Sequence, residues 1–343
     1  MRVREAESRI LLIGFGFFIA LALTEALLRA GLIPNIHHQR STRLAAETQN
    51  NSGKFRILVL GDSFIDNVRC PDCVYPLLKQ DLAGQAVSLT NGAGSGMGPV
   101  GYLGQMRRLG PKVRPDLVLL FYYVGNDLTN VQYRLNASLR ETLRRLMKPL
   151  LEELYLYHFC REKMNLLSRN TLNYRSLRDE GIPADLLELA RQGEMNHGYL
   201  VMSAAHKNYI LDNVLMETEE NLRAWQSVKG ILAEVHRQSQ KIGSRLAMVI
   251  IPHTVQVTRS HFAFFESLKF NLDERTLSSE KPQALLGEFC KEQGIACLDL
   301  LPHFRAQAGQ ELYWAKDEHF SGQGNRFAER LILEFVHDRL QAR

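Results

Sequence analysis

Five short apolar runs, separated by stretches with helical spacing, constrain most strongly how this chain of 343 residues can fold. The runs are residues 56–60, 86–90, 116–124, 246–251 and 295–301. The third run, DLVLLFYYV, is apolar almost throughout, which is typical of a central parallel strand covered on both faces. Strands that alternate with helices need crossover connections, so the pattern predicts a doubly wound α/β sheet.

Two of the intervening stretches carry clear helix signals. From Thr218 onward apolar residues recur every three or four positions, and Thr218 can cap this helix ahead of Glu219 and Glu220. Residues 281–293 behave likewise, with Gly294 as the predicted C-terminal stop. Chemistry in a doubly wound sheet gathers at the carboxyl ends of the strands, so the residues after each run are the first candidates for a site.

A different pattern fills the N-terminal segment. Residues 10–28 form an apolar stretch of 19 residues with one charge, Glu25, close to the length that spans a hydrocarbon core. Its apolar residues cover every face, unlike the single stripe of a soluble helix, and no clean small-x-small cleavage site follows. We therefore expect an uncleaved transmembrane anchor over residues 1–29, with Glu25 and Arg29 able to pair at its end.

The anchor leads into a predicted stalk over residues 30–53 and a main domain over residues 54–343. Arginines are balanced across the anchor, so the positive-inside rule does not decide its orientation; they are Arg2, Arg4 and Arg9 before it and Arg29, Arg40 and Arg43 after it. A short tail, one span and a large following domain favour an extracytoplasmic, periplasmic-side domain.

Composition excludes several classes of protein. With 45% hydrophobic and 23% charged residues, the chain is not disordered, collagen-like or a coiled coil. The net charge, 42 − 37 = +5, is mild and gives no argument for nucleic-acid binding.

Five cysteines are too few for a disulfide scaffold of this length; they are Cys70, Cys73, Cys160, Cys290 and Cys297. The CxxC spacing of Cys70 and Cys73 could form a small disulfide loop, a redox pair or half a zinc site. Because no second CxxC is present, a local structural role is favoured, whether or not the two are bridged.

Polar residues and glycines follow four of the strands. They are Gly61-Asp62-Ser63, Asn91-Gly92-Ala93-Gly94-Ser95-Gly96, Gly125-Asn126-Asp127 and Asp317-Glu318-His319. A serine nucleophile needs a base, and the base needs an orienting group; Ser63, His319 and Asp317 supply these three. The Ser63 amide, a turn amide after the second strand and the Asn126 side chain could stabilise an oxyanion.

These four blocks resemble the motifs of the SGNH (GDSL-type) hydrolases, over about residues 55–127 and 243–343. The resemblance implies a flavodoxin-like, three-layer α/β/α fold. It also implies that Ser63 is the nucleophile, His319 its base and Asp317 the orienting acid, with Asn126 in the oxyanion hole. No metal or organic cofactor is expected.

Four positions depart from the family pattern. Phe64 stands where the family has leucine after Gly-Asp-Ser, and Gly125 directly precedes Asn126 with no residue between them. The other two departures affect the site. Alignment on the family's Asn-x-Gly places Ala93 where the oxyanion glycine belongs, and a shift of one residue would bring in Gly92 or Gly94. The short spacing between Asp317 and His319 leaves open whether Asp317 or Glu318 faces the imidazole. Further candidates for the cleft are Asp62, Gly92, Gly94, Asp127 and His253. The histidines lack metal-ligand spacing, so no metal site is expected.

Residues 128–217 are not explained by the family core and are predicted to form a helical insertion. Residues 137–169 have largely helical spacing, with a break at Pro149. A basic stripe of Arg140, Arg144 and Lys148 is either a solvated face or a contact for anionic lipid or acidic glycan. Because the insertion directly follows Asn126-Asp127, we expect a lid that sets substrate choice.

An anchor, a stalk and such a domain look like the bacterial branch of the superfamily that modifies cell-envelope polysaccharides. The resemblance implies a serine esterase that removes O-acetyl groups from an envelope glycan. Transfer of the acyl group to a sugar hydroxyl is the first alternative, and a non-catalytic glycan-binding or scaffold protein is the second. The expected partners are an acylated glycan, the membrane through one helix, and polysaccharide-assembly proteins of the envelope.

Overall fold

The structure is a computed structural model that describes residues 2–34, 53–65, 70, 72–135, 154–171 and 174–341. The chain divides into two compact units, Met1–Ala45 with Ala137–Thr171, and Ala46–Asn136 with Leu172–Arg343. The predicted insertion at residues 128–217 is therefore shared between the units. Ala137–Thr171 belong with the apolar N-terminal helix, and the parts of the insertion before and after them belong with the sheet.

The larger unit is built on a five-stranded parallel sheet with the strand order β2-β1-β3-β4-β5. The strands are β1 (Phe55–Leu60), β2 (Val87–Asn91), β3 (Leu117–Tyr123), β4 (Arg245–Ile251) and β5 (Ala296–Asp299). This is the flavodoxin-like order of a doubly wound sheet, so the predicted fold class is confirmed. The fifth strand is shorter than predicted, because α16 (Leu301–Ala306) begins directly after it.

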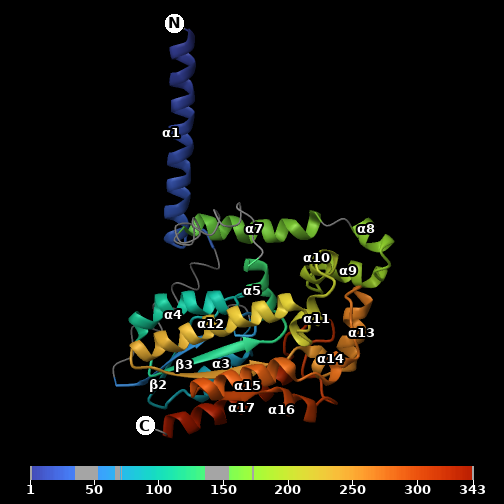
Figure 1. Ribbon diagram of the computed structural model, residues 1–343. Coiled ribbons are helices and arrows are strands. Elements are labelled where there is room, and N and C mark those ends of the chain that lie inside the picture. The colour runs from blue at the N-terminus through green and yellow to red at the C-terminus, as the bar shows by residue number, and fades with distance from the viewer. Residues whose placement is uncertain are drawn as a thin grey trace. The chain divides into compact units, whose positions relative to one another are not determined.

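The apolar runs form the strands of the sheet, and their side chains are apolar on both sides because helices cover both faces of the sheet. Every residue of β3 is buried, as its unbroken apolar run predicted, and Leu119 lies between Val59 of β1 and Ala247 of β4. On one face α4 (Pro99–Val113), α12 (Glu219–Lys241) and α15 (Lys281–Gln293) pack on the sheet. On the other face lie α3 (Val74–Asp81), α16 and α17 (Gly322–Gln341), which complete three layers (Figure 1).

Both predicted helix boundaries are confirmed. Thr218 is the N-cap of α12, and its Oγ1 accepts the backbone N–H of Asn221 at 3.1 Å. Gly294 ends α15 in the left-handed conformation, with φ of 65°, which a glycine adopts at no steric cost.

Short helices complete the larger unit. They are α5 (Asp127–Leu135), α8 (Tyr174–Asp179), α9 (Ala184–Gln192), α10 (Gly198–Ala205), α11 (Tyr209–Val214), the 3₁₀ helix η1 (Thr254–Gln256), α13 (Arg259–Ser267) and α14 (Arg275–Ser278). Cys70 and Cys73 form a disulfide just before α3, which selects the disulfide loop among the roles considered for this CxxC. Within the described residues there is no cluster of side chains suited to a metal ion.

The smaller unit contains α1 (Arg2–Arg29) and α7 (Tyr155–Thr171). Helix α1 is long and apolar enough to cross a membrane: its window Leu12–Arg29 has a mean hydropathy of 1.8 and is almost entirely exposed. Most of the predicted stalk, the basic stripe of Arg140, Arg144 and Lys148, and the break at Pro149 lie outside the described residues.

Candidate active site

Ser63 stands in the turn that leaves β1, at the carboxyl edge of the sheet. His319 and Asp317 lie in the loop that precedes α17, and a β-bridge between Tyr313 and Phe320 folds this loop back on itself. The Phe64 ring packs against both the His319 ring and the Phe320 ring, with centroid distances of 4.9 Å and 4.8 Å. Phe64, the apolar residue directly after the serine, therefore packs against the imidazole and supports it.

The structure brings the three predicted catalytic side chains into one hydrogen-bonded chain. His319 Nε2 lies 2.8 Å from Ser63 Oγ, and His319 Nδ1 contacts Asp317 Oδ1. Asp317 Oδ1 also accepts the backbone N–H of His319, at 2.9 Å. In the neutral imidazole with its proton on Nδ1, Nε2 is left to accept the serine proton, which is the arrangement of a nucleophile, a base and an orienting acid.

The surroundings favour the positive charge that His319 acquires when it takes a proton. Burial alone would lower the pKa of His319, but the hydrogen bond to Asp317 and the nearby charges of Asp317, Glu318 and Asp62 outweigh it. The pKa of His319 is raised to about 9. Burial likewise raises the pKa of Asp317, but the hydrogen bond and charge of His319 reverse the effect and hold it below its ordinary value.

Asp317, not Glu318, faces the imidazole, which answers the question that the short spacing left open. The Glu318 side chain turns to the sheet, where the Tyr123 hydroxyl donates to its Oε2 at 3.0 Å. Burial is the main reason that the pKa of Glu318 is raised to about 7. His253 Nε2 lies 4.0 Å from the same carboxylate.

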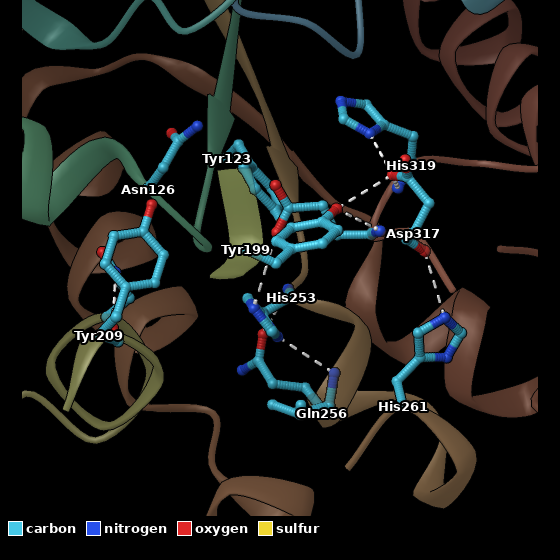
Figure 2. A network of polar contacts seen from close by, with 12 residues as sticks. Tyr123, Asn126, Tyr199, Tyr209, His253, Gln256, His261, Asp317 and His319 are labelled. Atoms are coloured by element: carbon cyan, nitrogen blue, oxygen red, sulfur yellow. Dashed lines mark hydrogen bonds and ion pairs between the residues drawn. The ribbon is translucent and has the colours of Figure 1, made fainter. Parts of the chain in front are cut away.

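A residue that sequence reasoning missed, Tyr199 of α10, holds the acidic end of the triad. Its hydroxyl donates to Asp317 Oδ1 at 3.1 Å and accepts the backbone N–H of Glu318 at 3.0 Å. Figure 2 shows the Tyr199 side chain directed at Asp317, with His261 approaching from the other side. His261 Nε2 lies 3.0 Å and 3.3 Å from the carbonyl oxygens of Trp314 and Asp317. No motif marks Tyr199, because its role arises only from the tertiary fold.

The Asn126 side chain is held at the end of β3 by a buried aspartate. Its Nδ2 donates to Asp62 Oδ2 at 3.2 Å, and the other Asp62 oxygen accepts the Phe64 amide at 3.0 Å. An amide nitrogen carries two hydrogens, so one remains for an oxyanion. In the described part of the chain the Ser63 amide donates no hydrogen bond, which leaves it as a second donor.

The turn after β2 differs from expectation. The Ala93 amide, predicted to be an oxyanion donor, donates to Asn91 Oδ1 at 2.9 Å and is therefore occupied. The two glycines considered in its place are occupied as well: the Gly92 amide donates to the Val59 carbonyl and the Gly94 amide to the Gly61 carbonyl. The short asparagine side chain captures a backbone amide two residues along, as it does in many turns.

Three further candidates for the cleft are buried and hold neighbouring groups of the site in place. Asp62, Asp127 and His253 are all buried. Asp127 accepts the Tyr102 hydroxyl, at 2.9 Å and 3.0 Å, and the Tyr123 amide at 3.1 Å. His253 Nδ1 accepts the Val255 amide at 3.1 Å, and burial lowers the pKa of His253 to about 3, so its imidazole is neutral.

No family model and no curated relative matches the sequence. Solved structures with a similar fold include the acetyl xylan esterase AlAXEase, at 11% identity and a TM-score of 0.45, covering 82% of this chain and 99% of that one. TesA matches at 13% identity and a TM-score of 0.41, covering 84% and 98%. A GDSL-like lipase from Bacteroides thetaiotaomicron matches at 11% identity and a TM-score of 0.44, covering 89% and 98%.

The strand order and the Ser63–His319–Asp317 arrangement agree with the resemblance to SGNH hydrolases that the sequence blocks carry. A parallel α/β sheet with an activated serine at its carboxyl edge is suited to nucleophilic attack on an ester carbonyl.

Proposed function

We propose that this chain is a membrane-anchored serine esterase that removes O-acetyl or related acyl groups from a polysaccharide of the cell envelope. The observation that carries the catalytic part is the 2.8 Å contact between Ser63 Oγ and His319 Nε2, with Asp317 on the far side of the imidazole. The envelope location is supported by the apolar helix α1 and by the Cys70–Cys73 disulfide, since disulfides persist mainly outside the cytosol.

The geometry gives each residue a step. Ser63 Oγ attacks the ester carbonyl while its proton passes to His319 Nε2, and the Ser63 amide and Asn126 Nδ2 stabilise the oxyanion. His319 then returns the proton to the departing sugar oxygen, which leaves an acyl-serine. Water, deprotonated by His319, attacks this ester and releases the carboxylic acid and free Ser63. Loss of one oxyanion donor costs roughly 10²–10³ in rate.

Hydrolysis of p-nitrophenyl acetate by the full chain in detergent tests the proposal. We expect the wild type to release p-nitrophenol and to react covalently with a fluorophosphonate, and the Ser63→Ala variant to do neither. Ser88→Ala, at a strand serine outside the triad, is the matched control. Equal, background-level rates in the wild type and Ser63→Ala would overturn the proposed activity.

The same acyl-serine could be resolved by a sugar hydroxyl, so a second assay addresses the substrate. An O-acetylated glycan is incubated with the enzyme, with and without excess non-acetylated glycan. Release of free acetate at a rate that added acceptor does not change supports hydrolysis. Acetyl transferred to the acceptor without free acetate would show a transferase.

A further inference from the structure

One carboxylate ties the end of α1 to the start of α7. Glu25 Oε1 accepts the backbone N–H of Tyr155 at 3.1 Å, and Oε2 accepts that of Leu156 at 2.7 Å. The first N–H groups of a helix have no partner within it, so Glu25 caps α7 from a different helix. Arg29 completes the joint: its Nε donates to Glu25 Oε1 at 2.7 Å, and its guanidinium lies 5.0 Å from the Tyr155 ring centroid.

This joint explains why the apolar helix carries a glutamate. A carboxylate close to hydrocarbon is costly unless charge and hydrogen bonds compensate it. Glu25 receives two backbone donors and one guanidinium, and it lies one turn before the end of the apolar window Leu12–Arg29. The start of α7 is therefore fixed at the level where α1 would leave a bilayer.

From this point α7 runs across the end of α1 and does not continue its direction (Figure 1). A helix that crosses the end of a membrane-spanning helix runs along the membrane surface. At helical spacing, Leu156, Phe159, Cys160 and Met164 share one side of α7. Cys160 is exposed and 67% of Met164 is accessible, so no side chain of the described residues covers this part of α7.

We propose that α7 is an interfacial helix whose Leu156–Met164 side lies in the boundary between lipid headgroups and acyl chains. This inference rests on the proposed membrane anchor. His158 and Arg161 lie on the opposite side, as the water-facing side requires. Lys163, whose ammonium lies 5.3 Å from the Phe159 ring, can extend along the apolar side to reach anionic headgroups.

The test places a fluorophore on each side of α7 in the full chain, reconstituted in phosphatidylcholine–phosphatidylglycerol vesicles. Cys290 and Cys297 are replaced by alanine, and Cys160 is labelled with the environment-sensitive dye NBD. The matched probe is His158→Cys in a Cys160→Ser background. We expect blue-shifted emission at Cys160 and several-fold stronger quenching by lipids with a shallow nitroxide than at position 158.

Glu25→Leu, which removes the cap and keeps the span apolar, should reduce the quenching at Cys160 while the protein still floats with the vesicles. Equal, weak quenching at positions 158 and 160 in vesicle-bound wild type would overturn the interfacial helix and leave the anchor standing. Failure of the wild type to float with vesicles would overturn the anchor and this inference together. Neither outcome affects the esterase assay with Ser63→Ala.

Discussion

Tyr199 lies in α10, a helix of the predicted insertion, and its side chain contacts the catalytic acid Asp317 directly. Its hydroxyl donates to Asp317 Oδ1 and accepts the Glu318 amide, so it fixes both the carboxylate and the backbone that presents His319. A phenol is a neutral hydrogen-bond donor, so it holds the Asp317 carboxylate in place and leaves its negative charge. That charge stabilises the imidazolium of His319. Residues 172–217 are therefore expected to affect basal hydrolysis, and not only substrate choice as the lid hypothesis implied.

Tyr199→Phe is expected to lower kcat about tenfold, since a hydrogen bond to a charged group is worth about 1.5 kcal/mol or more, and to leave KM little changed. Steady-state hydrolysis of p-nitrophenyl acetate measures both constants. Tyr209→Phe removes a hydroxyl from another buried tyrosine of the same segment and serves as the control. A wild-type kcat in Tyr199→Phe would rule out a positioning role.

The charges around His319 predict how activity depends on pH. The imidazole must be neutral to accept the serine proton, and its pKa is raised to about 9, so kcat/KM for a neutral ester should rise with pH up to that region. Glu318, with a pKa of about 7, is ionised over most of this rise and stabilises the imidazolium. Removing that negative charge must therefore lower the pKa of His319.

Glu318→Gln should move the rising limb of the kcat/KM profile to lower pH. Glutamine keeps an acceptor for the Tyr123 hydroxyl, so the change is mainly one of charge. Glu311→Gln, at an exposed carboxylate, should leave the profile in place. A profile that is unchanged, or shifted to higher pH, in Glu318→Gln would contradict the electrostatic account.

At the scale of elements, the disulfide joins Cys70 to Cys73 at the start of α3. Cys73 is the N-cap of α3, but its side chain makes no capping hydrogen bond. Its side chain instead fixes the start of α3 through the disulfide to Cys70. The sequence leaves three roles open for this CxxC, and the Cys70–Cys73 bond in the structure selects the disulfide loop.

Replacing both Cys70 and Cys73 by serine should lower the free energy of unfolding by about 2 kcal/mol, the chain entropy that a loop of this size restrains. Denaturant unfolding of the full chain in detergent, followed by near-ultraviolet circular dichroism, measures the change. Wild type treated with reductant should lose the same amount. Identical midpoints in all three samples would show that the loop adds no stability.

The elements themselves were largely predictable, since burial on both faces of a parallel sheet leaves a strong signal. The unbroken run of β3 and the cap at Thr218 needed no tertiary information. The donors of the oxyanion hole were harder. The place of Ala93 in a motif predicts that its amide is an oxyanion donor. In the structure this amide donates to the Asn91 side chain instead. Such a turn depends on local geometry that an asparagine two residues earlier only suggests.

At the scale of the whole molecule, the described residues form two units, and the sequence did not predict this division. The sequence predicts one insertion of the main domain over residues 128–217, yet Ala137–Thr171 group with the apolar helix. The capping of α7 by Glu25 belongs to this grouping, and it is a contact between residues 130 positions apart that periodicity cannot reveal. Glu25 and Arg29 were correctly paired, because an i,i+4 spacing is visible in sequence.

The orientation of the proposed membrane anchor is a further prediction. A C-terminal fusion to alkaline phosphatase, which is active only outside the cytoplasm, should be active, because a large domain with a disulfide follows the proposed span. A fusion to a fluorescent protein that matures only in the cytoplasm should be dark. The reverse pair of results would place the catalytic domain in the cytoplasm.

The two halves of the triad lie far apart along the chain, since Ser63 and His319 are 256 positions apart. At ribosomal rates this separation corresponds to a delay of about 10–50 s between the synthesis of the serine and that of its base. Until the loop before α17 has been made and folded, Ser63 is an ordinary hydroxyl. Under the proposed mechanism the serine stays inactive throughout synthesis, and chains that end before residue 319 have no base to activate it.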